Sequence, residues 1–479
     1  MKYIYILLLS GIIATTSSCT YTFPEDEVPT SGTADFTKLV TVGNSLTAGY
    51  MDGALYDAGQ EASFANILAT QMQLVGSGEF NQPDINAVDG DFGFSGGAYG
   101  RLYLKNPASP APSPIIPGQA ITDYSGDRSA LNNISVPGIK ITEAVFPGYG
   151  NPANGPGNYN PYFSRFASSP TTTFIADAAA ANGTFITFWL GANDVLGYAL
   201  AGATGNIDGQ NRGNLTSVAD FTAAYTACIS ILFSDGQKGI IANIPNINDI
   251  PHFTTVPWNA IPMDQATADA VNGSYAPYNG GLDLMVQAQI ITQEEADLRY
   301  VVFKDGANGI VIFDTNLTDL TPYNPGLVSM RMANSDDLIT LSAGTVLGLP
   351  ANAPVGVATP LGEEYTLTDA DLNKMADYVA DFNAVIMAAV DSNPNLVLLD
   401  INTIFTEFAR TGTSINGAGM DASIAPPFGA FSLDGIHPNQ RGSAWITSLF
   451  IDKINETFES NIPNINPNNW PGNALPVPQ

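Results

Sequence analysis

Positive charge and histidine are the scarcest features of this 479-residue chain. Sixteen Lys and Arg stand against 45 Asp and Glu, which gives a formal net charge of −29 at pH 7. A surface with this excess of carboxylates repels phosphate backbones, so we expect no nucleic-acid partner. The chain has only 2 histidines, His252 and His437, and any histidine-dependent chemistry must use one of them.

Cysteine is equally rare, with Cys19 and Cys228 as the 2 examples. Cys228 lies on an apolar stripe of a predicted helix, which favours a small buried hydrophobic side chain over a nucleophile. The sequence has no His-Glu-x-x-His segment and no cysteine cluster, so we expect no metal site. The segments 84–86 and 314–316 begin like calcium loops but lack the remaining ligands, and incidental surface calcium stays an alternative. No phosphate-binding glycine loop occurs, and we expect no cofactor.

The N-terminus has the layout of a secretory signal, predicted over residues 1–18. Its apolar run, residues 4–14, is too short to span a bilayer. Cys19 follows small residues and resembles the lipobox cysteine of bacterial lipoproteins, which is diacylated and becomes the mature N-terminus. The resemblance implies an exported protein that a lipid anchors to the bacterial cell envelope. Residues 19–34 then form the lipidated N-terminus and a flexible tether. Signal cleavage without lipidation is the alternative.

Apolar runs that alternate with amphipathic segments predict the fold class. Runs typical of buried strands occupy residues 36–42, 184–190, 239–244 and 396–401. Two capped amphipathic helices are predicted over 217–233 and 372–390. Because strands alternate with helices, we expect an α/β fold, a three-layer α/β/α sandwich with a central, mainly parallel sheet.

The long irregular stretches predict insertions rather than further domains. Turn-forming residues fill 78–162 apart from one compact element around 132–145, and residues 250–365 are mixed and without a repeat. We therefore predict a single domain over 35–460 with insertions at about 78–162 and 250–365. The tail, 461–479, is rich in Asn and Pro and is expected to be a surface strap or disordered.

Three loops at predicted strand ends hold the residue types that acyl transfer needs. A serine hydroxyl needs a base to take its proton, and a tetrahedral intermediate needs fixed donors at its oxyanion. Ser45 and Asn193 follow predicted strands, and His437 lies in a loop late in the chain. Because the carboxyl ends of parallel strands meet at one edge of the sheet, we expect the three residues to converge there. Asp434, three residues before His437, is close enough along the chain to hold the imidazole in one tautomer.

These residues match a known family pattern. The segments Gly43-Asn44-Ser45-Leu46, Asn133–Gly138, Gly191–Asp194 and Asp434–Pro438 resemble, in order, the four sequence blocks of the SGNH (GDSL-type) hydrolases. The resemblance covers roughly residues 36–458 and implies the flavodoxin-like sandwich of that family. It also implies that Ser45 is the nucleophile, His437 the base and Asp434 its orienting carboxylate. The oxyanion hole would consist of the Ser45 and Gly138 N–H groups and the Asn193 amide.

Each of these residues also has a structural interpretation. Ser45 could simply cap a helix, and the Asp434 segment could be an ordinary turn. A rival nucleophile is Ser95, because Gly93-Phe-Ser95-Gly-Gly97 matches the Gly-x-Ser-x-Gly elbow of α/β-hydrolases, although no buried strand precedes it. His252 could line the cleft or serve as a hydrogen-bonded structural histidine.

The expected function is that of an exported serine ester hydrolase. Its substrate would be a small-molecule, lipid or glycan ester, cleaved through an acyl-serine intermediate. The layout resembles large lipoprotein esterases of gram-negative bacteria, which implies an outer-membrane location facing the periplasm or the surface. A catalytically silent surface lipoprotein that binds glycans or partner proteins is the alternative, which the intact Ser45, Asn193, Asp434 and His437 set disfavours.

Overall fold

The computed structural model describes residues 28–105, 111–209 and 211–475. The predicted signal peptide, Cys19 and most of the predicted tether therefore lie outside the described residues. Within the described ranges, no helix combines the length and apolar character needed to cross a membrane.

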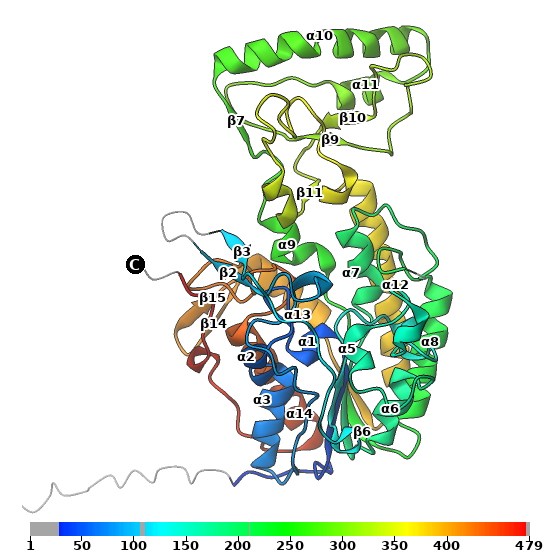
Figure 1. Ribbon diagram of the computed structural model, residues 1–479, viewed down its shortest axis with the longest axis vertical. Helices are drawn as coiled ribbons and strands as arrows, with labels where there is room; N and C mark the ends of the chain where they lie inside the picture. Colours follow the sequence, from blue (N-terminus) through cyan, green and yellow to red (C-terminus); the bar gives the residue numbers. More distant parts are fainter. Residues whose placement is uncertain (1–27, 106–110, 210, 476–479) are drawn as a thin grey trace, which may run out of the picture.

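A five-stranded parallel sheet lies at the centre of the larger part of the molecule, which we call the body (Figure 1). Its strands are β1 (Leu39–Gly43), β4 (Asn133–Ser135), β5 (Phe185–Trp189), β6 (Lys238–Ala242) and β13 (Leu396–Leu399). The spatial order is β13-β6-β5-β1-β4, and all four neighbouring pairs are parallel. The chain order therefore reverses between β1 and β5, and ligands of such sheets bind outside the carboxyl ends of the strands at that point.

The four predicted strands are confirmed, with shifted ends, as β1, β5, β6 and β13. Every residue of β1 and β5 is buried, because helices cover both faces of the sheet, and this explains their continuous apolar sequences. The fifth strand, β4, lies inside the 78–162 segment that was expected to be an insertion, so this part of the segment belongs to the sheet.

Helices form a layer on each side of the sheet. Helices α3 and α14 pack together on one side, and α6, α8 and α12 lie on the other (Figure 1). The α-helices are α1 (Ser45–Ala48), α2 (Asp57–Glu61), α3 (Phe64–Gln73), α4 (Ile141–Ala144), α5 (Pro161–Ser164), α6 (Phe174–Ala180), α7 (Asn193–Leu200), α8 (Val218–Leu232), α9 (Pro251–Thr254), α10 (Gln265–Gln287), α11 (Gln293–Arg299), α12 (Asp369–Asp391), α13 (Ile401–Thr411) and α14 (Gln440–Phe458). Short 3-10 turns occur at Phe92–Phe94, Arg128–Ala130, Pro152–Asn154, Ile247–Asp249, Leu341–Thr345, Glu363–Tyr365 and Pro467–Asn469.

The predicted caps start two of these helices. The Ser217 hydroxyl accepts a hydrogen bond from the Asp220 N–H at 3.1 Å, and α8 begins at the next residue. Thr368 and Asp371 form a reciprocal capping box at the start of α12. Each cap satisfies N–H groups that have no partner inside the helix, which fixes where the helix begins.

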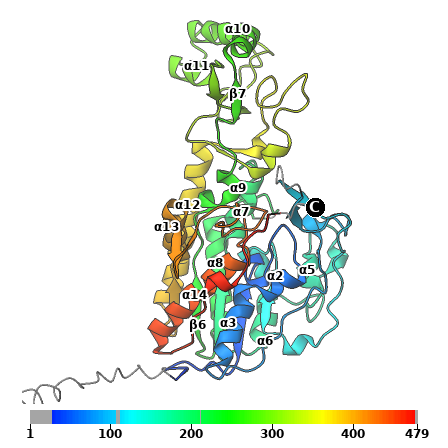
Figure 2. The same cartoon turned by 90° about the vertical axis from the view of Figure 1, so that its left-hand side faces the viewer.

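Residues 261–361 have a hydrophobic core of their own, separate from the core of the body. We call this part, within the predicted 250–365 insertion, the lobe, and it stands at one end of the body above α7 and α9 (Figures 1 and 2). The remaining strands are two or three residues long and pair antiparallel in twos. Pairs that involve the lobe are β7 (Ile261–Met263) with β8 (Gly306–Asn308), β9 (Val311–Phe313) with β10 (Met330–Met332), and β11 (Leu338–Ile339) with β12 (Thr366–Leu367). Pairs in the body are β2 (Leu102–Leu104) with β3 (Pro112–Pro114) and β14 (Thr413–Ile415) with β15 (Ala418–Met420).

The described part of the tail, residues 461–475, binds to the body surface. The Asn473 side-chain amide donates to the carbonyl oxygens of Ile424 and Phe431 at 2.8 Å each. The Arg441 N–H donates to the Pro471 carbonyl oxygen at 3.1 Å. This part of the tail is therefore a strap across the loop that precedes α14.

Candidate active site

Ser45 is held at the carboxyl end of β1, next to the point where the strand order reverses. It is the first residue of α1, and the Asn44 side chain caps this helix by accepting from the Leu46 N–H at 3.0 Å. A Cβ on Gly43 would lie 1.9 Å from the Thr47 hydroxyl oxygen, so the sharp turn into α1 requires glycine there. Ser45 is 6% exposed and lines a cavity.

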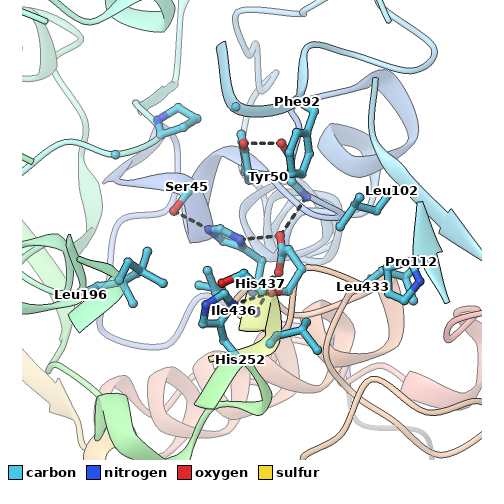
Figure 3. A pocket seen from close by; sticks show the side chains of 18 of the residues that line it. Ser45, Tyr50, Phe92, Leu102, Pro112, Leu196, His252, Leu433, Ile436 and His437 are labelled. Atoms are coloured by element: carbon cyan, nitrogen blue, oxygen red, sulfur yellow. Dashed lines mark hydrogen bonds and ion pairs between the residues drawn. The ribbon is translucent and has the colours of Figure 1, made fainter. Parts of the chain in front are cut away.

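His437 joins Ser45 to Asp434. Its Nε2 lies 2.8 Å from the Ser45 Oγ, across a sequence separation of 392 residues, and its Nδ1 lies 2.9 Å from Asp434 Oδ2 (Figure 3). A carboxylate only accepts hydrogen bonds, so Nδ1 carries the proton and Nε2 is the acceptor for the serine hydroxyl. The three residues thus have the order nucleophile, base and orienting carboxylate.

Asp434 stays ionised although its side chain is only 9% exposed. Its Oδ1 accepts the N–H groups of Ile436 at 2.8 Å and His437 at 2.9 Å, and its Oδ2 also accepts the Gly53 N–H at 2.9 Å. Burial raises the pKa of this carboxyl, but the His437 imidazole and these donors outweigh it and bring the pKa to about 2. The local Asp-x-x-His turn therefore supplies a fixed negative charge behind the imidazole.

The expected oxyanion donors lie around the same cavity. Ser45, Gly138 and Asn193 all line it. Across residues 28–105, 111–209 and 211–475, the backbone N–H groups of Ser45 and Gly138 have no hydrogen-bond acceptor. The Asn193 amide donates to the Ile139 carbonyl oxygen at 2.9 Å, and its second N–H remains for a ligand. Gly138 has φ +80°, a conformation that favours glycine. These donors suit a developing oxyanion.

His252 combines the two roles that the sequence left open. It lines the cavity, and its N–H donates to the Gly435 carbonyl oxygen at 2.8 Å. Its Nδ1 lies 3.2 Å from the Asp434 carbonyl oxygen, and burial lowers its pKa. A Cβ on Gly435, which has φ +73°, would lie 2.8 Å from the His252 nitrogen. His252 therefore supports the backbone of the turn that carries Asp434.

Sequence reasoning missed the segment that holds the Asp434 turn from the other side. The Asp52 carboxylate accepts from the Leu433 N–H at 2.9 Å and from the Tyr56 hydroxyl at 2.8 Å. The Tyr50 ring lies 4.9 Å from the His437 ring, centroid to centroid. Nothing in the spacing of Tyr50 and Asp52 indicates their contacts with the Asp434 turn, because Asp52 and Leu433 are 381 residues apart along the chain.

The structure does not bring Ser95 to a histidine. Its hydroxyl donates to Asp91 Oδ1 at 2.5 Å and accepts from the Tyr99 N–H at 2.9 Å. It therefore closes a local turn, in agreement with the absence of a preceding buried strand. Cys228 is buried, and burial raises the pKa of its thiol to about 12, which leaves it protonated.

The two calcium-like segments also have other roles. Asp314 Oδ2 accepts from Arg331 Nε at 2.6 Å inside the lobe. The Asp84 carbonyl oxygen accepts from the side chains of Arg165 and Asn86. In the described ranges, no group of three or more His, Cys, Asp or Glu side chains is placed to hold a metal ion.

The cavity beside Ser45 has a volume of about 710 Å³ and mainly apolar walls. Leu196 lies on one side of the Ser45–His437 pair, and Leu433, Leu102 and Pro112 lie on the other (Figure 3). Val256, from the segment that leads into the lobe, and Leu341 and Thr345, from the lobe itself, complete the wall. The lobe is thus connected directly to the edge of the site.

Comparison of the chain with protein-family models, with curated proteins and with solved structures found no match.

Proposed function

We propose that this protein is a serine ester hydrolase with Ser45 as its nucleophile. The observation that carries the proposal is the continuous chain of hydrogen bonds from the Ser45 Oγ through His437 to Asp434, at 2.8 and 2.9 Å. A buried serine whose hydroxyl contacts an imidazole nitrogen, in the wall of an apolar cavity, is the arrangement that activates a hydroxyl for acyl transfer.

The proposed reaction has two halves. His437 Nε2 takes the proton as the Ser45 Oγ attacks the ester carbonyl carbon, and the negative oxygen is stabilised by the N–H groups of Ser45, Gly138 and Asn193. The bond to the alcohol oxygen then breaks, and His437 gives the proton to that oxygen. In the second half His437 takes a proton from water as the water oxygen attacks the acyl carbon of the acyl-serine. The bond from that carbon to the Ser45 Oγ then breaks, His437 returns the proton to the Oγ, and the carboxylic acid is released.

The four sequence blocks support placing the chain among the SGNH (GDSL-type) hydrolases, and the strand order agrees with the flavodoxin-like sandwich that this placement implies. The proposal includes export and a lipid anchor on Cys19 at the bacterial outer membrane. Its substrates would be carboxylic esters of lipids or acylated glycans, and no step requires a cofactor.

The decisive test is hydrolysis of p-nitrophenyl acetate, butyrate and octanoate by the purified protein and by two serine variants. We expect Ser45→Ala to lower kcat/KM by about 10⁴-fold or more, because the nucleophile is lost. Ser95→Ala is the matched control and should retain activity, since its hydroxyl only closes a surface turn.

A fluorophosphonate probe provides a second readout on the same variants. We expect covalent labelling of the wild type and of Ser95→Ala but not of Ser45→Ala. A wild type that neither cleaves the three esters nor reacts with the probe would favour the binding lipoprotein instead. If only Ser95→Ala abolished activity, Ser95 and not Ser45 would be the nucleophile.

A further inference from the structure

The cavity beside Ser45 has one positive side chain, Arg212, that forms no ion pair with any of the described residues. Arg212 is the only Lys or Arg among the described residues that line it, and Asp434 is the only carboxylate. Asp434 is already engaged by His437 and by backbone N–H groups. The ion pairs of the described residues do not include Arg212.

The backbone of Arg212 is fixed from two directions. The buried Lys140 ammonium donates to the carbonyl oxygens of Asn211 at 2.8 Å and Asn214 at 2.5 Å, on either side of Arg212. The Arg212 carbonyl oxygen packs directly on Gly197 of α7, where a Cβ would lie 1.9 Å from it. The exposed side chain therefore starts from an anchored position at the rim of the cavity.

The guanidinium lies between an aromatic wall and the proposed oxyanion hole. Its Cζ is 4.4 Å from the centroid of the Phe94 ring, which holds it by a cation–π contact. The same atom is 3.6 Å from the point where a Cβ of Gly138 would stand. The Glu143 carboxylate is near enough for Arg212 to lower its pKa, but it accepts its hydrogen bond from the Lys140 backbone N–H at 2.8 Å and forms no ion pair with the guanidinium. The edges of the guanidinium are therefore available to a bound molecule.

A single fixed cation in a cavity with apolar walls is complementary to an anionic amphiphile. A guanidinium binds carboxylate or phosphate oxygens in pairs, and these charge-assisted hydrogen bonds are stronger in an apolar surrounding. The chain as a whole carries a net charge of −29, so Arg212 is a local exception to the field around it.

We propose that Arg212 is a specificity-determining residue that selects molecules in which a carboxylate or phosphate group lies next to an apolar chain. The inference rests on the proposed ester hydrolysis only for the identity of the reacting bond. The substrate class would then be acyl esters with an anionic group near the cleaved bond, with the apolar chain along the cavity wall.

The test measures binding rather than turnover. Calorimetric titration of Ser45→Ala compares octanoate and octyl phosphate with octanamide, which has the same chain and no charge, all below micelle formation. We expect both anions to bind roughly tenfold or more tightly than octanamide, and their advantage to shrink as salt is added. Inorganic phosphate alone should bind far more weakly, because it cannot use the apolar wall.

Two further variants in the Ser45→Ala background assign the preference to Arg212. Arg212→Gln should abolish the advantage of the anions, and Arg212→Lys should retain part of it. Arg410→Gln is the matched control, since it removes an exposed arginine of α13 that pairs only with Glu407, and should keep the full preference. The same fold-change for Arg410→Gln as for Arg212→Gln would overturn the proposal, as would equal binding of octanoate and octanamide.

These results separate the inference from the proposed function. A protein that prefers anions through Arg212 but hydrolyses no ester would refute the hydrolase and leave the binding preference established. A protein that hydrolyses p-nitrophenyl butyrate and binds octanamide as tightly as octanoate would refute the role of Arg212 alone.

Discussion

Two buried charge clusters, one in the body and one in the lobe, differ in what surrounds them. In the body, Asp434 holds His437, and His437 contacts the Ser45 hydroxyl at the wall of an open cavity. In the lobe, Arg331 binds Asp314 at 2.6 Å and Asp337 through two bonds of 2.7 Å. These three lobe side chains are all 5% exposed or less.

The comparison shows that a buried charge pair is not by itself a reactive site. The imidazole has one nitrogen on the Asp434 carboxylate and the other on the Ser45 hydroxyl, and a cavity lies beside it. Burial alone would lower the pKa of Arg331, but Asp337 and Asp314 outweigh this effect and raise the pKa above its ordinary value. The guanidinium therefore keeps its proton. The lobe cluster therefore has only a structural role to fill, whereas the body cluster has the arrangement that the proposed ester hydrolysis requires.

The largest expected effect is that of Asp434→Asn on activity. An asparagine amide facing Nδ1 would favour the imidazole tautomer with its proton on Nε2, which cannot accept the serine proton. We expect kcat for p-nitrophenyl butyrate to fall by roughly 10³-fold or more. Steady-state kinetics on variants with the wild-type circular dichroism spectrum provide the measurement, and a loss below tenfold would contradict the role of Asp434.

The lobe cluster is tested by Arg331→Met, which leaves the buried carboxylates of Asp314 and Asp337 without their positive partner. We expect the free energy of unfolding to fall by about 3–5 kcal/mol, measured by urea denaturation. Arg410→Gln is the matched control, since its ion pair is exposed and should contribute little.

A triple variant sharpens the same comparison. Replacing Arg331 by Met and both Asp314 and Asp337 by Leu removes the three charges of this cluster together. We expect the free energy of unfolding of this variant to be close to that of the wild type. An Arg331→Met protein as stable as the wild type would show that the cluster is not structural.

The smallest expected effect is the acid dependence of stability. The folded-state pKa of Asp434, about 2, lies below its ordinary value of 3.8, so the folded state is favoured by about 2 kcal/mol above pH 4. This contribution is lost as the pH falls from 4 through 2. Urea denaturation between pH 5 and 2 should show a steeper loss for the wild type than for Asp434→Asn. Equal slopes would contradict the low pKa.

The sequence predicted the four long strands because each is a continuous apolar run, which is what a strand with both faces covered must be. It missed β4, Asn133–Ser135, because two of the three residues are polar and the strand lies among turn-forming residues. It also missed the separate core of the lobe, since strands of two or three residues leave no periodic pattern.

The candidate site was predictable in part. Asp434 and His437 are three residues apart, so one turn brings them together, and Ser45 and Asn193 follow recognisable strands. The contacts of Tyr50, Asp52 and Arg212 carry no local signal, because their partners come from other loops.

The sequence alone determined the short-range features of this protein: the capped helices, the buried strands and the turn that joins Asp434 to His437. These depend on residues within one or two turns of each other, so local geometry is sufficient. Only the tertiary structure decided that the Ser45 hydroxyl, 392 residues away, meets His437 and that Arg212 faces the same cavity. The reason is that the order of strands in the sheet sets which loops are neighbours, and this order results from packing the whole core rather than from any one segment.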